Sequence, residues 1–205
     1  MASKLEIVNM ALDELGEAII ADVDGTEDRT LIAARHWDRA LRAFLREAPW
    51  SWALKQDELA EASPVPAFGW EARYPLPDDF VALYSLNELN VYYFSDVHEI
   101  QSGYLMTDAD EAKIKYVYFP TATELDAFLE RMDGQALDIF VLLLAARMAP
   151  KMVRDGRETA LTLEQQYRQA ISRVRTAMAN ERRAFIRDPA GQSNFELSRY
   201  GDIQG

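Results

Sequence analysis

The residues of this chain whose types and spacing could do chemistry are mostly carboxylates. Asp22 and Asp24 stand one residue apart ahead of a glycine, and paired carboxylates in a tight loop can supply a nucleophile and a general acid or base. A second acidic cluster, Asp108-Ala109-Asp110-Glu111, begins like a calcium-binding loop. The two histidines, His36 and His98, lie far apart, and the chain has no cysteine. Carboxylates therefore supply the main candidates for catalysis or metal binding.

The segment Asp22-Val23-Asp24-Gly25-Thr26 resembles the D-x-D-G-T loop of haloacid-dehalogenase-type phosphatases. The resemblance implies that Asp22 attacks phosphorus and Asp24 acts as acid or base, with Lys55 and the pair Asp78-Asp79 as conceivable partners. That chemistry requires a buried parallel strand before the loop, and the alternation of strands and helices that builds a parallel sheet is missing. We therefore expect an Asp/Gly turn that leads into a helix. Magnesium-dependent phosphatase activity is kept as the alternative function.

The other chemical candidates are expected to be structural. In the acidic cluster at 108–111, Lys113 stands where a calcium loop needs its turn glycine and Phe119 where it needs a bidentate glutamate. Solvated turn carboxylates are the expected alternative. His36 adjoins Trp37 on a predicted helix and is expected to pack or to contact another subunit. The sequence thus predicts no catalytic residue, no metal site, no cofactor and no enzymatic activity.

Composition places limits on partners. The net charge is −12, and 49% hydrophobic residues are enough for a core without disulfide bonds. The absence of cysteine fits assembly in a reducing cytoplasm. An acidic surface is unsuited to gripping a nucleic acid backbone, which needs clustered Lys and Arg. Neither a secretion signal nor a membrane span is expected, because no basic segment precedes an apolar one at the start and no run of about eighteen apolar residues occurs.

The charges are unevenly distributed along the chain. Residues 51–120 hold four basic and twelve acidic side chains, whereas residues 121–205 hold twelve of each. Within residues 165–187, six arginines accompany a single glutamate, Glu181. A molecule polarised in this way could dock on copies of itself or on an acidic partner.

Periodicity and breaker residues predict an α+β fold that is mainly helical: a bundle of about four helices with a small antiparallel β insertion and an extended C-terminal tail. Helices are expected at residues 3–16, 26–48, 123–134, 137–148 and 156–187. Short strands are expected at residues 91–94, 103–106 and 114–119. The predicted domain covers residues 1–187, helical at 1–50 and 121–187 with the β insertion at 51–120, and residues 188–205 form a docking tail.

Two segments combine prolines with large aromatic rings, Ala48–Ala53 and Tyr74–Phe80. Proline beside aromatic residues is typical of places where an element must stop, so these segments are interpreted as architectural. The tryptophans are expected in a core or a subunit interface, because stacking on bases normally comes with a basic groove. The structural signature residues are Pro49, Trp50, Trp52, Tyr74, Pro75 and Pro77.

Three further segments belong to the same pattern: Ala11–Gly16, Gly103–Asp108 and Leu144–Ala149. In their order along the chain, the five segments resemble the tail tubular protein A family, the head-to-tail adaptors of short-tailed bacteriophages. The resemblance implies a structural virion protein at the head-tail junction, assembled in the host cytoplasm. It implies a dodecameric ring between the portal protein and the tail nozzle protein. DNA would pass through this ring without sequence-specific binding.

Docking on the portal or on a neighbouring subunit is assigned to the end of the long helix and to the tail. The reason is that the helix end is rich in arginine and that such a tail is often mobile alone and becomes ordered on its partner. The predicted docking residues are Arg182, Arg183, Phe185, Phe195, Leu197 and Tyr200.

Overall fold

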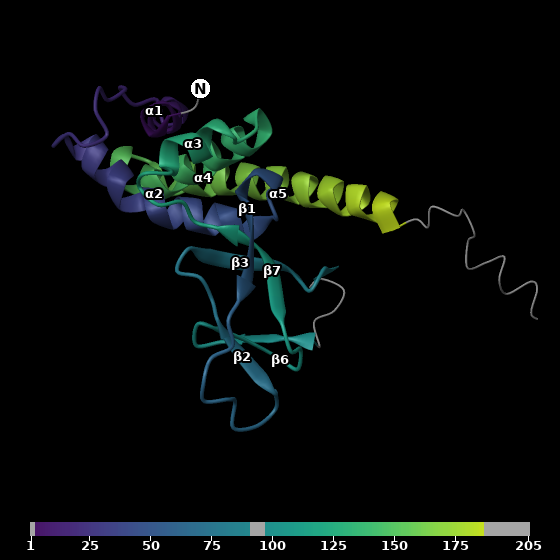
Figure 1. Ribbon diagram of the computed structural model, residues 1–205. Helices are drawn as coiled ribbons and strands as arrows, with labels where there is room; N and C mark the ends of the chain where they lie inside the picture. Colours follow the sequence, from purple (N-terminus) through teal and green to yellow (C-terminus); the bar gives the residue numbers. More distant parts are fainter. Residues whose placement is uncertain (1–2, 91–96, 187–205) are drawn as a thin grey trace, which may run out of the picture. The chain divides into compact units, whose positions relative to one another are not determined.

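The computed structural model describes residues 3–90 and 97–186 (Figure 1). The chain divides into two compact units, residues 1–167 and 168–205. The helices are α1 (Lys4–Glu14), α2 (Asp28–Glu47), α3 (Leu125–Glu130), α4 (Gly134–Met152) and α5 (Gly156–Ile186), with a short 3-10 helix, η1 (Ser51–Ala53). The strands are β1 (Leu54–Leu59), β2 (Ala72–Pro75), β3 (Phe80–Leu86), β4 (Leu89–Asn90), β5 (Glu99–Gln101), β6 (Tyr104–Thr107) and β7 (Ala112–Tyr118).

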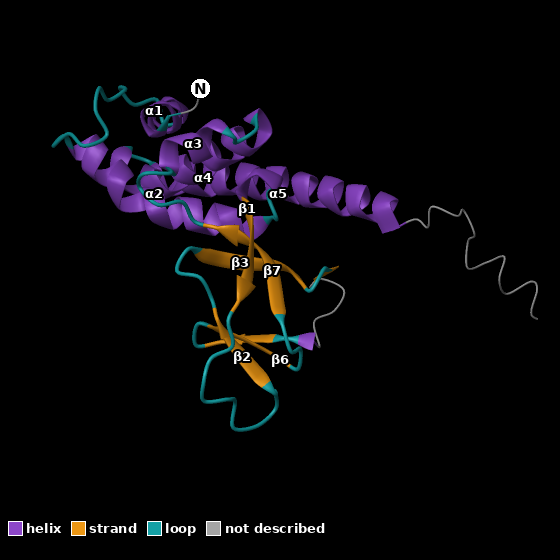
Figure 2. Cartoon of the chain, viewed as in Figure 1, coloured by secondary structure: helices purple, strands orange, loops and turns teal. Residues whose placement is uncertain are grey.

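The prediction of a mainly helical four-helix bundle is wrong. The described residues form five helices and two antiparallel sheets, one with the strand order β1-β7-β3-β4 and one with the order β2-β6-β5 (Figure 2). About half of these residues are helical and about a fifth lie in strands. The β content was underestimated because β1 and β3 were not recognised as strands. The fold is therefore α+β with two sheets.

The helices of the first unit are arranged around α4. Both α1 and α2 contact α4, whose sequence is apolar on nearly every side, and its side chains from Ile139 to Ala149 are mostly buried. A helix that is hydrophobic all round belongs in a core. The predicted end of this helix near Pro150 is slightly early, because Pro150 is accommodated in the last turn and α4 continues to Met152. Gly134 begins α4, and the Asp133 carboxylate accepts the Ala136 N–H at 2.8 Å as its N-cap.

The start of the chain follows its local signals closely. Ser3 and Glu6 form the predicted capping box at the N-terminus of α1. Gly16 follows the helix with φ of 68°, the left-handed conformation that glycine adopts without steric cost. The predicted second helix is α2, which ends at Glu47 just before Pro49.

In the larger sheet, β7 lies between β1 and β3, with Leu54 opposite Val117 in one pair and Leu86 opposite Ile114 in the other. Both β3 and β7 also contact α2. In the smaller sheet, β6 lies between β2 and β5. The strands predicted at 103–106 and 114–119 are confirmed as β6 and β7, whereas the strand predicted at 91–94 lies outside the described residues. Among the helices that the structure describes, none combines the length and apolar character needed to span a membrane.

Candidate functional site

The segment with the phosphatase-like pattern forms a turn, as expected. The backbone N–H of Asp24 donates to Oδ1 of Asp22 at 3.0 Å, and the Thr30 hydroxyl donates to the Asp22 carbonyl at 3.3 Å. The apolar run before it is held by the side-chain amide of Asn9, which pairs with the N–H and C=O of Ile20 at 2.9 and 3.1 Å. Both sheets of the described residues are antiparallel, so no parallel strand in them positions Asp22.

The first signature segment ends α2 and fills the core beside it. Trp50 is 1% exposed and stacks on Phe44 with ring centroids 4.6 Å apart. Its indole N–H donates to the Phe44 carbonyl at 3.2 Å, which is one of the last four carbonyls of α2 and lacks a partner within the helix. Trp52 packs edge-on against Phe128 of α3 at 5.2 Å. Trp50 and Trp52 thus pack against core residues of the subunit, which is one of the two places expected for the tryptophans.

The second signature segment connects the two sheets. Tyr74 is buried in β2, and its hydroxyl donates to the Ala109 carbonyl at 2.8 Å. Burial raises the pKa of this phenol. Pro75 ends β2, and the N–H of the next residue, Leu76, donates to the Gly103 carbonyl. The segment closes with a turn in which the Phe80 N–H donates to the Pro77 carbonyl at 3.0 Å. Both signature segments therefore act as connections between elements.

A polar network surrounds Asp79, which was predicted only as a possible phosphatase ligand. Oδ2 of Asp79 lies 2.8 Å from Lys55 Nζ, and Oδ1 accepts the Tyr116 hydroxyl at 2.9 Å. Lys55 Nζ also lies 3.5 Å from Glu124, the N-cap residue of α3, and 4.0 Å from the Tyr118 ring centroid. The candidate lysine and one of the candidate acids thus pair with each other, and their contacts join β1, β7 and α3.

The pKa values in this network follow from these contacts. Burial alone would lower the pKa of Lys55, but the hydrogen bond to Asp79 and the charges of Asp79 and Glu124 raise it above its ordinary value. Burial raises the pKa of Tyr116, and its hydrogen bond to Asp79 raises it further. Hydrogen bonds from Thr121 lower the pKa of Glu124. The contacts with Asp79 and Glu124 therefore favour the charged form of Lys55.

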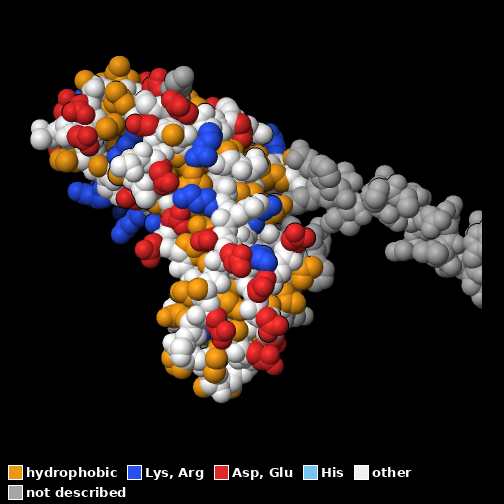
Figure 3. Space-filling view, in the orientation of Figure 1, with side chains coloured by type: hydrophobic (Ala, Val, Ile, Leu, Met, Phe, Trp, Pro, Cys, Tyr) orange, Lys and Arg blue, Asp and Glu red, His pale blue; other side chains and the backbone are white. Residues whose placement is uncertain are grey.

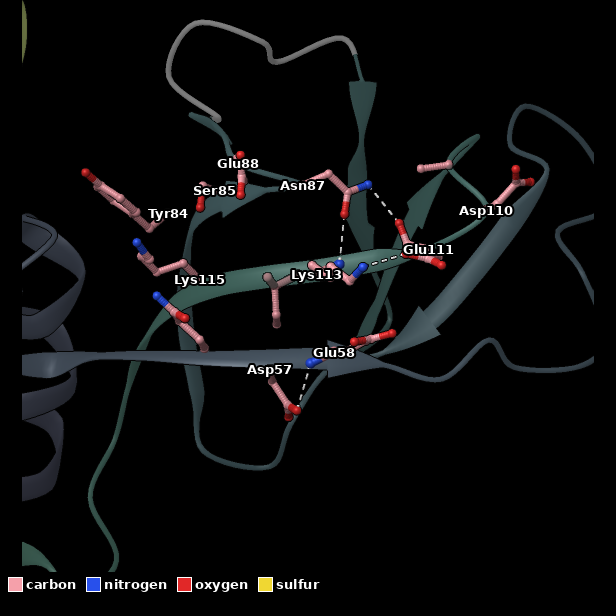
Figure 4. A pocket seen from close by; sticks show the side chains of 13 residues that line it. Asp57, Glu58, Tyr84, Ser85, Asn87, Glu88, Asp110, Glu111, Lys113 and Lys115 are labelled. Atoms are coloured by element: carbon pink, nitrogen blue, oxygen red, sulfur yellow. Dashed lines mark hydrogen bonds and ion pairs between the residues drawn. The ribbon is translucent and has the colours of Figure 1, made fainter. Parts of the chain in front are cut away.

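An open groove of about 1110 Å³ lies on the larger sheet (Figure 4). We call it the acidic groove, because five carboxylates and two lysines line it together with polar and apolar side chains. Lys113 Nζ forms an ion pair with Glu111 at 2.7 Å, and this hydrogen bond lowers the pKa of Glu111. In the space-filling view, Asp and Glu side chains gather over the strands (Figure 3). The charged groove residues are Asp57, Glu58, Glu88, Asp110, Glu111, Lys113 and Lys115.

The acidic groove is shaped by a tight hairpin turn between β3 and β4. Asn87 and Glu88 have positive φ values of 48° and 68°, the combination that a type I′ turn requires. The Asn87 side chain accepts the Lys113 N–H at 2.9 Å and donates to the Glu111 carbonyl at 2.8 Å (Figure 4). The hairpin is thereby fixed against β7. Among the described residues, no group of three metal-ligating side chains has the geometry to hold a metal ion.

Arginines form a row along the solvent side of α2, which the predicted docking residues do not include. Arg35, Arg39, Arg42 and Arg46 are all exposed, and their spacing of four, three and four residues places them on one helical face. The opposite face carries buried Trp37 and other core residues. We call these four residues the α2 arginine row.

His36 lies beside this row. Burial lowers the pKa of His36, and the nearby charges of Arg147, Arg35 and Arg39 lower it further. Burial also lowers the pKa of Arg147, and the charge of Arg39 adds to this effect. The arrangement concentrates positive charge at the middle of α2.

The structure describes only the backbone of three of the six predicted docking residues. Arg182, Arg183 and Phe185 lie in the backbone range of α5, but the described side chains end before them. Phe195, Leu197 and Tyr200 lie outside the described residues. Their docking role stays a prediction. In comparison with known proteins, no family model and no curated protein matches this chain.

Proposed function

We propose that this protein is a non-enzymatic structural subunit of a short-tailed bacteriophage, and that it forms a ring between the portal and the tail nozzle. The observation that carries the proposal is that both signature segments hold other elements of the subunit in place. Trp50 of the first segment closes the end of α2, and Asp79 of the second holds Lys55, which follows the first. The residues on which the resemblance depends therefore build the framework of the subunit.

The distribution of charge supports the same function. An adaptor must let DNA slide past without retaining it, and carboxylates on the channel wall would repel phosphates and remove the contacts that cause binding. The acidic β region, which includes the acidic groove, supplies such a surface or a surface for a basic partner. The arginines of the long helix and the tail would dock on the portal or on a neighbouring subunit.

The test is the mass and shape of the protein in solution. Light scattering combined with negative-stain imaging would be carried out on the protein alone and after addition of portal rings. A ring with a central hole in either sample is the expected result. A compact monomer that ignores the portal would overturn the proposal.

A phosphatase assay provides the complementary measurement. The wild-type protein and the Asp22→Asn variant would be incubated with magnesium and a phosphate monoester. The structural function predicts no phosphate release above background from either protein. Release that is abolished in Asp22→Asn would instead establish the haloacid-dehalogenase-like alternative.

A further inference from the structure

We propose that the α2 arginine row of one copy docks into the acidic groove of a second copy, so that neighbouring subunits associate head to tail through complementary charge. This inference rests on the proposed function, because it assigns the contact between neighbouring subunits of the ring. It concerns two surfaces of the first unit whose net charges have opposite signs.

The α2 arginine row is a strong concentration of unpaired positive charge. Within the described residues, none of its four guanidinium groups forms an ion pair. Arg42 instead lies over the Phe119 ring, 4.2 Å from its centroid. A row of like charges on one helical face is unfavourable for the isolated helix. An acidic partner would remove this repulsion.

The acidic groove has the opposite imbalance. Its five carboxylates face two lysines, and Lys113 is already paired with Glu111. Glu58, Glu88 and Asp110 form no ion pair within the described residues. These three come from β1, the β3–β4 hairpin and the loop before β7, so they surround the groove on different sides (Figure 4). Several positive charges can therefore be neutralised there at once.

The dimensions of the two surfaces agree. From Arg35 to Arg46 the row extends about 16 Å, given the rise of about 1.5 Å per helical residue. The larger sheet has four strands, and with a strand spacing of about 4.8 Å it is about 14 Å wide from β1 to β4. An α-helix laid across the strands could thus bring its row of arginines over the whole groove.

A second copy is a better occupant for the row than a nucleic acid. The protein carries a net charge of −12, which repels a polyanion, and four arginines on one helix are few against this charge. The acidic groove of a second copy offers several carboxylates close together. Because the row and the groove are different surfaces, each copy can contribute one and receive the other. Such heterologous contacts close into rings when the rotation between copies allows it.

Charge reversal tests this pairing. One variant carries Arg39→Glu and Arg46→Glu, and the other carries Glu58→Lys and Glu88→Lys. Each variant alone should lose ring assembly, with the concentration needed for assembly raised at least about tenfold, because each contact then sets like charges against each other. An equimolar mixture of the two should assemble, since every contact in an alternating ring joins opposite charges. Asp13→Lys with Glu14→Lys is the control for the Glu58 and Glu88 variant, because it raises the net charge by the same amount outside the groove and should assemble as the wild type does.

The readouts are light scattering and negative-stain imaging, with unfolding temperatures measured to show that each variant is folded. If the wild type assembles and both reversal variants assemble equally well, this inference is overturned and the proposed function stands. If the variants fail alone and also fail when mixed, direct pairing of the two surfaces is overturned. If the wild type forms no ring, alone or on portals, both proposals fail together.

Discussion

The ammonium group of Lys55 lies 2.8 Å from the carboxylate of Asp79 in an ion pair that connects the start of β1 to the second signature segment. Lys55 follows the first segment by two residues, at the start of β1, and Asp79 belongs to the second. The pair is only partly shielded, since Lys55 is 36% exposed and Asp79 22%. The contribution of this pair to stability therefore depends on the hydrogen bonds around it as much as on charge.

We expect two substitutions of Asp79 to destabilise the protein by different amounts. Asp79→Asn keeps an acceptor for the Tyr116 hydroxyl but removes the charge, so it should cost about 1 kcal/mol. Asp79→Ala also leaves that hydroxyl without its acceptor and should cost about 2 kcal/mol. Urea unfolding measures both. Asp78→Asn, at an exposed neighbouring carboxylate, is the control and should change little. Equal effects at the two positions would contradict the network.

A pair of tryptophan substitutions tests whether Trp50 closes α2. Trp50→Phe retains an aromatic ring but leaves the Phe44 carbonyl without its donor, and the expected cost is about 1 to 3 kcal/mol. The indole N–H of Trp52 has no hydrogen-bond partner among the described residues, so Trp52→Phe should cost less than about 1.5 kcal/mol. Thermal unfolding of both variants gives the comparison. A larger loss at Trp52 would show that ring packing, and not the hydrogen bond, is what matters.

The start of α5 can approach α4 closely because Gly156 has no side chain. A Cβ atom at Gly156 would overlap the Ala149 carbonyl group, so Gly156→Ala should destabilise the protein by about 1 to 3 kcal/mol through forced movement of backbone. Gly134→Ala is the matched control, because a Cβ there meets no atom within 4 Å. That change should be neutral or stabilising by up to about 1 kcal/mol. Calorimetric unfolding measures both variants, and a neutral Gly156→Ala would refute the close approach.

Much of the helical structure could be predicted because its signals are local. The capping box of Ser3 and Glu6 starts α1 and Pro49 follows α2, each acting within a few residues of the helix end. Strand β1 was missed because four successive residues from Lys55 to Glu58 are polar and show no alternation. Its existence depends on pairing with β7, more than fifty residues away in the chain. Short-range patterns cannot report such pairing.

The candidate surfaces were harder to predict than the fold. The acidic groove is assembled from residues near 57, 87 and 111, which no short motif connects. The sequence showed an excess of acid in this region but not where the carboxylates meet. By contrast, the local motif at Asp22 suggested chemistry that its surroundings do not support, since a turn and not a parallel strand carries it. The spacing of Arg35, Arg39, Arg42 and Arg46, by contrast, is local and can be read directly from the sequence.

His36 offers a reporter for the electrostatics of the α2 arginine row. Because its pKa in the folded protein is lowered below 6.5, the unfolded chain takes up a proton first as the pH falls. Stability should therefore be unaffected well above pH 6.5 and should decrease as the pH falls from there toward the lowered native pKa. His36→Gln removes this decrease. A slope in this pH range that persists in His36→Gln would have to come from other groups.

Direct titration of His36 by NMR should give a midpoint below 6.5, and Arg39→Gln should move the midpoint upward. The reason is that Arg39 is one of three guanidinium groups, with Arg35 and Arg147, whose charge opposes protonation of the imidazole. Arg46→Gln is the control: it removes the same charge from the same row, two turns further along α2, and should leave the midpoint unchanged. An equal shift in both variants would mean that the pKa of His36 responds only to the net charge of the protein. Positive charge would then not be concentrated at the middle of the row.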